Sequence, residues 1–541
     1  MCRYLFIVFF ICNFSFANEI KQIEFREDDA LFRIAQPLDP RSHIKVFLPS
    51  IPYSYIAKNT NAGLIRSDDN AQGWVYDLAK SHTRIDDFTY VFEIRKNLHF
   101  QDGSPLDIDS FINNLNYFKK NPFLYTNIDK INFTIKKIDK YHFQIKLDKK
   151  YEMFFLDLAR IYFYTDEYLQ NHYPKSENTG SATTLAGAFG AGPYILQSGY
   201  ALGHKQSAKL ELKANPYYWD ARYPKIQNIT VYTELSLDQA FEDVTQFEGK
   251  LDITPIAFNQ KIDVILSNYA KLLIKESTNN ITIYFNLLNG NEKIKNKEVR
   301  QALNQVLNQK NLLNFVYKNE GKISPFSTSI NYEIVKKIAL KNEYPQNTLS
   351  EKKIQKLLQG LNLKISTQDR FMFLWKGIEF QLQQYGVTLD FNITSSEKDI
   401  YKQLFEHHSW DMLTWGNDDW YYKNPWTVFF IYENDSPWSA IPYDHIMQVN
   451  IEKLFETNIK SQQYEDIVTD ILYRAKDMAY TLTVPSPNKV IAINKEVIYK
   501  PYKGAMIPLW KIQITKNHWS IRRDKKYPLK LQNPIKPQRE K

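Results

Sequence analysis

The side chains best suited to binding a charged ligand lie together just after residue 414, where two neighbouring carboxylates stand among aromatic rings and an amide. The candidate ligand-binding residues in this segment are Trp415, Asn417, Asp418, Asp419 and Trp420. A free ammonium group that leaves water needs a carboxylate partner, and neighbouring aromatic faces add cation–π attraction. The segment therefore has side chains suited to a positively charged group. The alternative is a surface turn with two solvated carboxylates and core aromatic side chains.

Metal binding and catalysis find little support in the same sequence. His407 and His408 are adjacent, and neighbouring residues on a strand point to opposite faces, so we do not expect them to share one metal ion. The Gly-x-Ser-x-Gly, His-Glu-x-x-His and P-loop patterns of common hydrolases and nucleotide enzymes do not occur. We therefore predict a protein that is not an enzyme and holds no metal or cofactor. An exported hydrolase built from scattered carboxylates is the alternative in this class.

The amino terminus has the pattern of a cleaved secretory signal over residues 1–17. Residues 1–3 carry a basic side chain, residues 4–16 are mostly apolar, and the small side chains of Ser15 and Ala17 suit a signal peptidase. The apolar run is shorter than the ~20 residues that span a bilayer, so an uncleaved anchor is the lesser alternative. The signal predicts a periplasmic location.

Both cysteines of the chain, Cys2 and Cys12, fall inside this signal. The exported chain is therefore expected to have no disulfide and no cysteine nucleophile. Lipid attachment at Cys12 is an alternative, although residues 9–11 are bulky where such sites need small side chains.

The composition is that of a large globular protein. The 541 residues exceed the ~250–300 at which a single core stops growing, so two or three lobes are expected. Hydrophobic residues make up 43% of the chain and charged residues 24%, which excludes general disorder. The formal net charge is +9, but the basic residues are spread along the chain and no DNA-reading motif accompanies them. We expect no nucleic-acid partner.

Hydrophobic patterns predict a mixture of strands and helices. Residues 89–95 alternate like a half-buried strand, and Asp102 with Gly103 forms a turn signal. Asp107 is placed to cap a helix whose apolar face begins at Ile108.

Further along, residues 299–316 have helical spacing, whereas residues 410–415 and 490–498 have the pattern of strands. Strands and helices mixed in this way indicate an α/β architecture made of α+β lobes.

Four stretches of the sequence resemble the bacterial extracellular solute-binding proteins of the oligopeptide, dipeptide and nickel type, which serve ABC importers. The two most specific stretches read YVFEIRKNLHFQDGSPLDID at 90–109 and LELKANPYYW at 210–219, the latter after the AGPY of 191–194. The others are 61–65 with 77–81, and 283–286 with 298–303. They follow one another in the family's order, and the likeness thins after about residue 320.

The resemblance implies a fold like that of type II periplasmic binding proteins, a three-lobed clamshell with a hinge. Lobe I would combine residues 18–60, 184–279 and 500–541, and lobe III would be residues 280–499. Lobe II, residues 61–183, would be an insertion that enlarges the cleft. The ligand would be held between lobes I and III.

The resemblance also implies roles for individual residues. In peptide-binding relatives, an aspartate three residues after a tryptophan pairs with the α-amino group of the peptide, and Asp418 stands three residues after Trp415. The stretch before Pro425 is longer here than in the family, so the alignment can also select Asp419. Residues 484–488, which end at Asn488, match a stretch that lines the cleft in relatives.

The function implied by the resemblance is capture of a solute, with a peptide favoured, and its delivery to ABC permease subunits in the inner membrane. We expect a monomer. The thinner likeness in lobe III leaves another possibility open: a binding-protein scaffold reused as a sensor, a chaperone or a receptor for a non-peptide ligand. Nickel complexes are bound by some members of the family.

Overall fold

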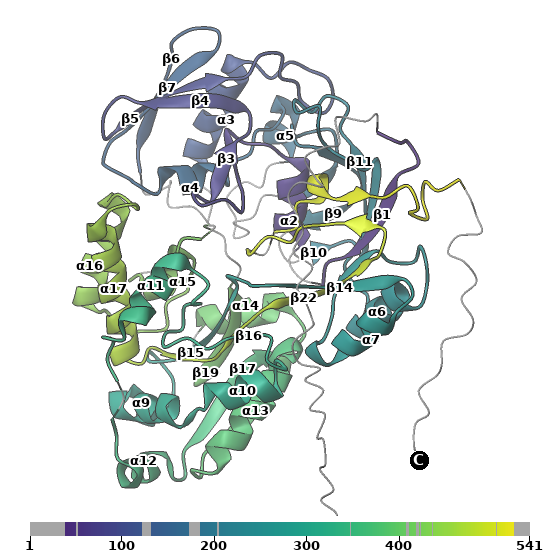
Figure 1. Cartoon of the computed structure of the whole chain (residues 1–541). Helices are drawn as coiled ribbons and strands as arrows, with labels where there is room; N and C mark the ends of the chain where they lie inside the picture. The colour runs from purple at the N-terminus through teal and green to yellow at the C-terminus, as the bar shows by residue number, and fades with distance from the viewer. Residues whose placement is uncertain are drawn as a thin grey trace, which may run out of the picture. The chain divides into compact units, whose positions relative to one another are not determined.

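The computed structural model describes residues 38–49, 52–121, 131–172, 184–202, 205–346, 348–406, 410–417, 421, 423–434, 436–504 and 506–523. The predicted signal with its cysteines, the two adjacent histidines, and Asp418, Asp419 and Trp420 lie outside these residues. Within the described ranges, no helix has both the length and the apolar character needed to cross a membrane. Most of the described strands belong to three sheets, which Figure 1 shows with the helices that cover them.

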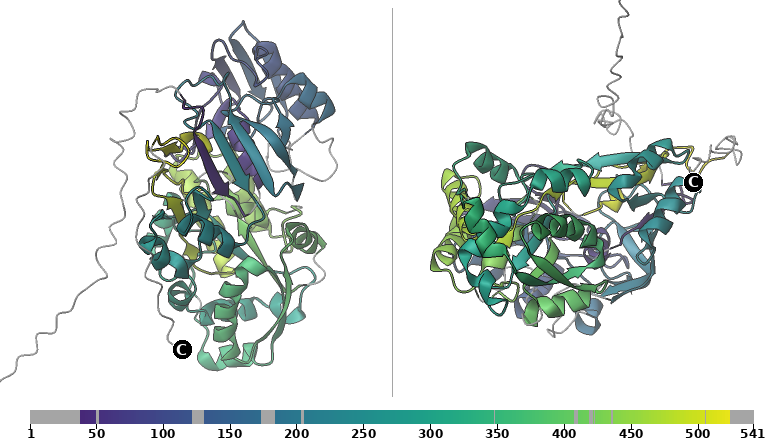
Figure 2. Two further views of the ribbon diagram at one scale, coloured as in Figure 1. Left: turned by 90° about the vertical axis from the view of Figure 1, so that its right-hand side faces the viewer. Right: turned by 90° about the horizontal axis from the view of Figure 1, so that it is seen from below.

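The largest sheet draws its strands from distant parts of the chain, and we call the part built around it lobe I. Its nine described strands follow the order β10-β9-β11-β12-β1-β13-β22-β14, with β8 paired to β9. The left view of Figure 2 shows β1 among the strands of this sheet. The bounds are His43–Phe47 (β1), Thr184–Gly187 (β8), Tyr194–Leu202 (β9), Lys205–Gln206 (β10), Lys209–Ala214 (β11), Asn228–Tyr232 (β12), Ile253–Pro255 (β13), Ala270–Lys275 (β14) and Lys489–Asn494 (β22).

Alternate side chains of this sheet pack on its two faces, as the period of a strand requires. On β22, Ile491 and Ile493 join a core with helix α2 (Pro52–Thr60) and with Trp510. Val490 and Ala492 face the opposite core, which contains residues of α6 (Leu237–Thr245) and α7 (Lys261–Leu266). The strand predicted at 490–498 is confirmed up to Asn494. A turn at residues 495–496 separates it from the short strand β23 (Val497–Ile498), which belongs to another sheet.

The second sheet, the centre of lobe II, is antiparallel with the order β4-β5-β7-β6. Helix α3 (Ile108–Lys120) belongs to the same core, and the Asp107 side chain accepts hydrogen bonds from the amides of Asp109 and Ser110. The cap and helix predicted from the sequence are confirmed, as is the strand near residue 90. The strands are Ala79–Arg84 (β4), Thr89–Ile94 (β5), Phe133–Lys137 (β6) and His142–Leu147 (β7), and helix α4 (Phe154–Leu158) follows them.

The third sheet, the centre of lobe III, has the order β18-β17-β19-β15-β20. Strand β17 runs parallel to both β18 and β19, and β15 is antiparallel to β19. The helix predicted over 299–316 is divided, because Asn308 accepts a hydrogen bond from the amide of Asn311 and starts a new helix. The elements are Asn280–Phe285 (β15), Asn362–Gln368 (β17), Thr388–Thr394 (β18), Met412–Asn417 (β19), Thr481–Leu482 (β20), Lys297–Val306 (α9) and Gln309–Phe315 (α10).

Two stretches of chain connect the sheets of lobes I and III. Residues 276–279 lead from β14 to β15, and residues 483–488 lead from β20 back to β22. Beside the second crossing, β16 (Gly321–Lys322) pairs with β21 (Ser486–Pro487). Because β22 pairs with β13 and β14, we propose that the boundary between these lobes lies before Lys489, earlier than the predicted boundary at residue 499.

Candidate functional site

The candidate site lies at one edge of the lobe III sheet, where β17 and β19 both end. These neighbouring strands are parallel, so their carboxyl ends reach the same edge, where open α/β sheets bind ligands. Strand β17 is followed at once by η3 (Asp369–Phe371), which contains Arg370. The guanidinium of Arg370 donates a hydrogen bond of 2.7 Å to Gln368 Oε1.

Gly416 brings the end of β19 close to this arginine. A Cβ atom placed on Gly416 would lie 3.2 Å from the Phe371 ring and 4.0 Å from Arg370 Nη2. The sequence analysis missed Arg370 because it is far from Trp415 in the chain. The available signal was a cation, Arg370, three residues after the alternating apolar and polar residues of 363–367. It had to be combined with a second predicted strand, residues 410–415, which ends at the candidate segment.

The structure places the predicted aromatic of this segment inside lobe III. Trp415 is 2% exposed and packs against Tyr401 and Trp438, with ring centroids 4.7 and 5.5 Å away. Its indole Nε1 is buried without a hydrogen-bond partner among the described groups. Asn417 is the last residue of β19, and its backbone is in register with Asn280 of β15. The roles of Asp418, Asp419 and Trp420 stay predictions.

Asn488 lies at the crossing between lobes I and III. Its Nδ2 donates to Glu320 Oε2 at 3.3 Å, and its amide donates to the Glu320 carbonyl at 3.2 Å. Glu320 in turn forms an ion pair of 2.5 Å with Lys261 of α7. Trp415 and Asn417 thus lie on β19 on either side of Gly416, the residue beside Arg370, whereas the described polar contacts of Asn488 are with Glu320.

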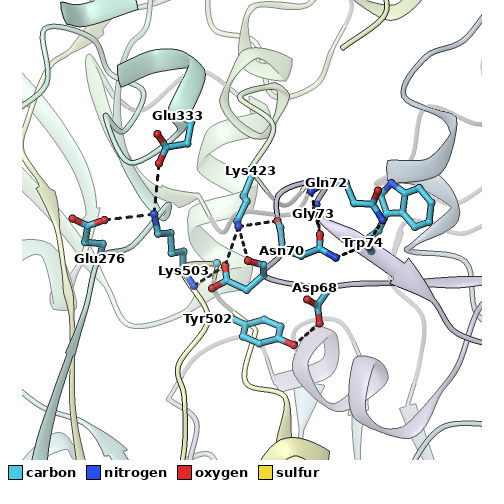
Figure 3. Close-up of polar contacts among 12 residues, drawn as sticks. Asp68, Asn70, Gln72, Gly73, Trp74, Glu276, Glu333, Lys423, Tyr502 and Lys503 are labelled. Carbon is cyan, nitrogen blue, oxygen red and sulfur yellow. Dashed lines mark hydrogen bonds and ion pairs between the residues drawn. The ribbon is translucent and has the colours of Figure 1, made fainter. Parts of the chain in front are cut away.

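A turn of lobe II reaches the same region of lobe III. Strand β2 (Ile65–Ser67) leads into residues 68–70. Lys423, which follows the candidate segment, donates to the backbone carbonyls of Asp69 and Asn70 at 2.5 and 2.8 Å (Figure 3). Its Nζ also lies 3.7 Å from Asp69 Oδ1. The Lys423 ammonium therefore links lobe III to lobe II through two backbone carbonyls and the Asp69 carboxylate.

Lobe I contacts the same turn through Tyr502 and Lys511. Both donate to Asp68 Oδ2 at 2.8 Å, and Figure 3 shows the tyrosine contact. Burial acts to raise the pKa of Asp68, but the Lys511 ammonium and the two hydrogen bonds outweigh it, so the pKa is lowered. The carboxylate is therefore held in its charged form.

Lys503 connects this turn to the first crossing. Its amide donates to Asp69 Oδ1 at 3.3 Å, and its Nζ lies 3.5 Å from Glu276 Oε2 (Figure 3). Glu276 also pairs with Lys322 at 2.5 Å, and this hydrogen bond lowers the pKa of Glu276. Residues 68–70 are thus a junction at which all three lobes meet.

The side chains of this region are suited to binding a charged group. Arg370 can bind a carboxylate. The described residues contain no group of three or more His, Cys, Asp or Glu side chains placed to hold a metal ion.

Comparison with solved structures shows the fold to which the chain belongs. The chain superposes on NikA from Staphylococcus aureus in complex with Ni(L-His)2 with a TM-score of 0.69 and 18% identity, covering 88% of this chain and 100% of NikA. It superposes on the oligopeptide-binding protein AppA from Bacillus subtilis, in complex with a nonapeptide, with a TM-score of 0.70 and 17% identity, again covering 88% and 100%. The fold is that of type II periplasmic binding proteins, as predicted.

The sequence comparisons then assign the family. The profile of the bacterial extracellular solute-binding proteins, family 5, middle region, matches residues 73–439. The chain belongs to this family. The nickel-binding protein NikA of Staphylococcus aureus is 23% identical over 434 residues, which cover 78% of this chain and 80% of that relative.

Proposed function

We propose that this protein is an extracytoplasmic receptor that captures a peptide between lobes I and III and delivers it to the permease subunits of an ABC importer. It acts as a monomer in the periplasm after removal of residues 1–17, and it releases its ligand chemically unchanged. The relatives that support this proposal are solute-binding proteins.

The observation that carries the proposal is the position of Arg370 beside Gly416. A free peptide has a carboxylate at one end and an ammonium at the other. Arg370 supplies a cation for the first, and the carboxylate of Asp418 or Asp419, a few residues along the chain from Gly416, is predicted to bind the second. Opposite charges supplied by neighbouring strands suit a zwitterionic ligand. The structural likeness to AppA in complex with a nonapeptide supports the same ligand class.

A second candidate ligand is a complex of nickel with amino acids. The match to NikA, 23% identical over most of both chains, favours it. The carboxylates of such a complex would also suit Arg370, so the two ligands differ in what faces Asp418 and Asp419. A free ammonium would need one of these carboxylates, whereas an amine already bound to nickel would not.

Native mass spectrometry of the exported chain, purified gently from a periplasm, tests the proposal. Added mass spread over many peptide values supports a broad peptide receptor. One discrete added mass with the isotope pattern of nickel supports the second candidate. A bare protein that also shows no thermal shift with di- to decapeptides or with the nickel–histidine complex contradicts both, and favours a scaffold reused as a sensor or chaperone.

A further inference from the structure

A turn of lobe III contacts lobe I beside the two crossings. Residues 317–320, which we call the 317–320 turn, follow α10 and lead into β16. The amide of Glu320 donates to the Tyr317 carbonyl at 2.8 Å, and the two residues between them have positive φ angles of 49° and 66°. These are the features of a type I′ turn. Such a turn brings its first and last residues close together, so both can contact the same neighbour.

That neighbour is one helical segment of lobe I, η2 (Phe258–Gln260) with α7. The Phe258 ring is nearly perpendicular to that of Tyr317, with centroids 5.2 Å apart. Lys261 comes three residues later, on the same side of the segment, and forms the ion pair of 2.5 Å with Glu320. Phe258 packs both against the core that contains Tyr317 and against a core of lobe I. An aromatic contact and an ionic contact therefore bind the turn to lobe I.

Both contacts are largely shielded from solvent. Tyr317 is 4% exposed, and the side chains of Lys261 and Glu320 are 20% and 17% exposed. Salt screens a partly buried ion pair less than an exposed one. If the lobes separated here, Tyr317 would be uncovered and Glu320 would lose its cation. The contact therefore stabilises the arrangement of lobes in which it forms.

The same turn is fixed to both crossings between lobes I and III. The second carboxylate oxygen of Glu320 accepts a hydrogen bond from Asn488 in the second crossing, where β16 also pairs with β21. Lys322, at the end of β16, pairs with Glu276 in the first crossing at 2.5 Å. Rotation of lobe I on lobe III has to take place at these crossings, so it moves the groups that hold the turn.

We propose that the 317–320 turn is a conformational device that holds lobes I and III in their closed arrangement before a ligand binds, through its contacts with Lys261 and Phe258. The structure has this arrangement, because the 68–70 turn of lobe II contacts both other lobes. The inference rests on the proposed function, in which a ligand is captured between lobes I and III. A ligand held by both lobes binds the closed form better, so its apparent affinity increases with the fraction of closed molecules.

The first experiment measures the separation of the lobes without ligand. Residues 18–541, the predicted exported chain, contain no cysteine, so two spin labels can be attached at chosen positions. Glu242→Cys on α6 of lobe I and Lys402→Cys on α14 (Glu397–Glu406) of lobe III replace exposed side chains. Double electron–electron resonance between the labels then gives the populations of closed and open molecules.

Lys261→Met and Glu320→Gln should each increase the ratio of open to closed molecules about three- to tenfold, because each removes one charge of the pair. The matched controls are Lys353→Met on α12 (Glu351–Leu358) and Glu298→Gln on α9, which break a pair of the same types within lobe III. Both controls should keep the wild-type distances. Wild-type distances in both test variants overturn the inference, whether or not any ligand binds.

The double variant Lys261→Met/Glu320→Gln tests whether the two charges act as one contact. It should open no more than either single variant, since the second substitution has no partner left to remove. Additive opening would mean that each side chain acts on the lobes separately, and would overturn the ion pair as the cause.

The second experiment measures affinity by titration calorimetry for two probes, tetraalanine and the bis-histidine complex of Ni²⁺. The test variants Lys261→Met and Glu320→Gln should bind the probe that wild type binds about three- to tenfold more weakly. A lower melting temperature with wild-type distances and affinities would show that the contact only stabilises the fold. If wild type binds neither probe, the proposed function fails, while the distance measurement still decides whether the turn holds the lobes closed.

Discussion

At the scale of single residues, the charge of Arg370 has the clearest consequence. It lies beside Gly416 and is oriented by Gln368. Replacing Arg370 with Gln removes the cation, and a hydrogen bond to a charged group contributes about 1.5–3 kcal/mol. We expect the affinity for a ligand with a free carboxylate to fall by about ten- to a hundredfold, as measured by titration calorimetry.

Arg370→Lys keeps the charge but loses the planar fork, so its affinity should lie between those of wild type and Arg370→Gln. Arg41→Gln is the control, since Arg41 is exposed and pairs with Asp39 on lobe I. Equal affinities for Arg370→Gln and this control would show that the ligand carboxylate is bound elsewhere.

The sequence alone predicts residues well where the cause is local. Asp107 caps its helix through amides two and three residues away, so its type and position were sufficient. Arg370 could not be found in this way, because only the parallel register of β17 and β19 brings it to Gly416. Trp415 shows where local reasoning leaves two alternatives open. Its ring could serve a ligand or a core, and the rings of Tyr401 and Trp438 place it in the core of lobe III.

At the scale of elements, Gly192 allows β9 to start against the end of α2. Its amide donates to the Thr60 carbonyl at 3.1 Å, and a Cβ atom there would lie only 2.4 Å from the Thr60 carbonyl carbon. Gly192→Ala must therefore push two backbones apart, and we expect the free energy of unfolding to fall by about 3 kcal/mol. Urea denaturation measures the change.

Gly360→Ala is the matched control for that substitution. Unlike Gly192, Gly360 has a left-handed backbone, with a φ of 69°, but no atom lies within 4 Å of the added carbon. Gly360→Ala should lower the free energy of unfolding by only about 1 kcal/mol, through backbone strain. Similar losses for both variants would mean that the contact between Gly192 and Thr60 is not tight.

Elements were predictable where hydrophobic periodicity was unbroken. The strand predicted at 89–95 ends within one residue of its predicted bound, and the helix begins directly after Asp107, as predicted. The helix predicted over 299–316 is interrupted because the Asn308 side chain competes for a backbone amide, and an apolar pattern does not contain that information.

At the scale of the whole molecule, acidic groups join the lobes. Asp68 and Glu276 have pKa values below those of the free side chains, about 3.9 and 4.3. A group with a lowered folded pKa stabilises the folded state above its unfolded pKa, and this contribution is lost as the pH falls through the folded value. We expect the free energy of unfolding to decrease below about pH 4, as measured by urea denaturation between pH 6 and pH 3.

Asp68→Asn should reduce that pH dependence, because the amide cannot lose a charge. Asp390→Asn, at an exposed position of β18, is the control and should keep the wild-type dependence. A wild-type acid profile in Asp68→Asn would show that the contacts with Tyr502 and Lys511 contribute little to the linkage between lobes.

The division into three lobes followed from family likeness over residues 61–310, and its boundaries stay a prediction. The location of β22 could not be predicted, because residues 490–498 have the same alternating pattern whichever sheet they enter. Pairing with β13 and β14, more than 200 residues earlier in the chain, decides it.

The position of β22 also limits the order in which the sheets can fold. Synthesis and export proceed from the amino end, and β13 and β14 emerge long before Lys489–Asn494, the strand that lies between them. The sheets of lobes II and III can therefore form first. Until β22 is made, the edges of β13 and β14 that it will pair with have no partner strand. We expect closure of the lobe I sheet to be a late step of folding, and a chain that stopped before Lys489 to leave those edges open to intermolecular pairing.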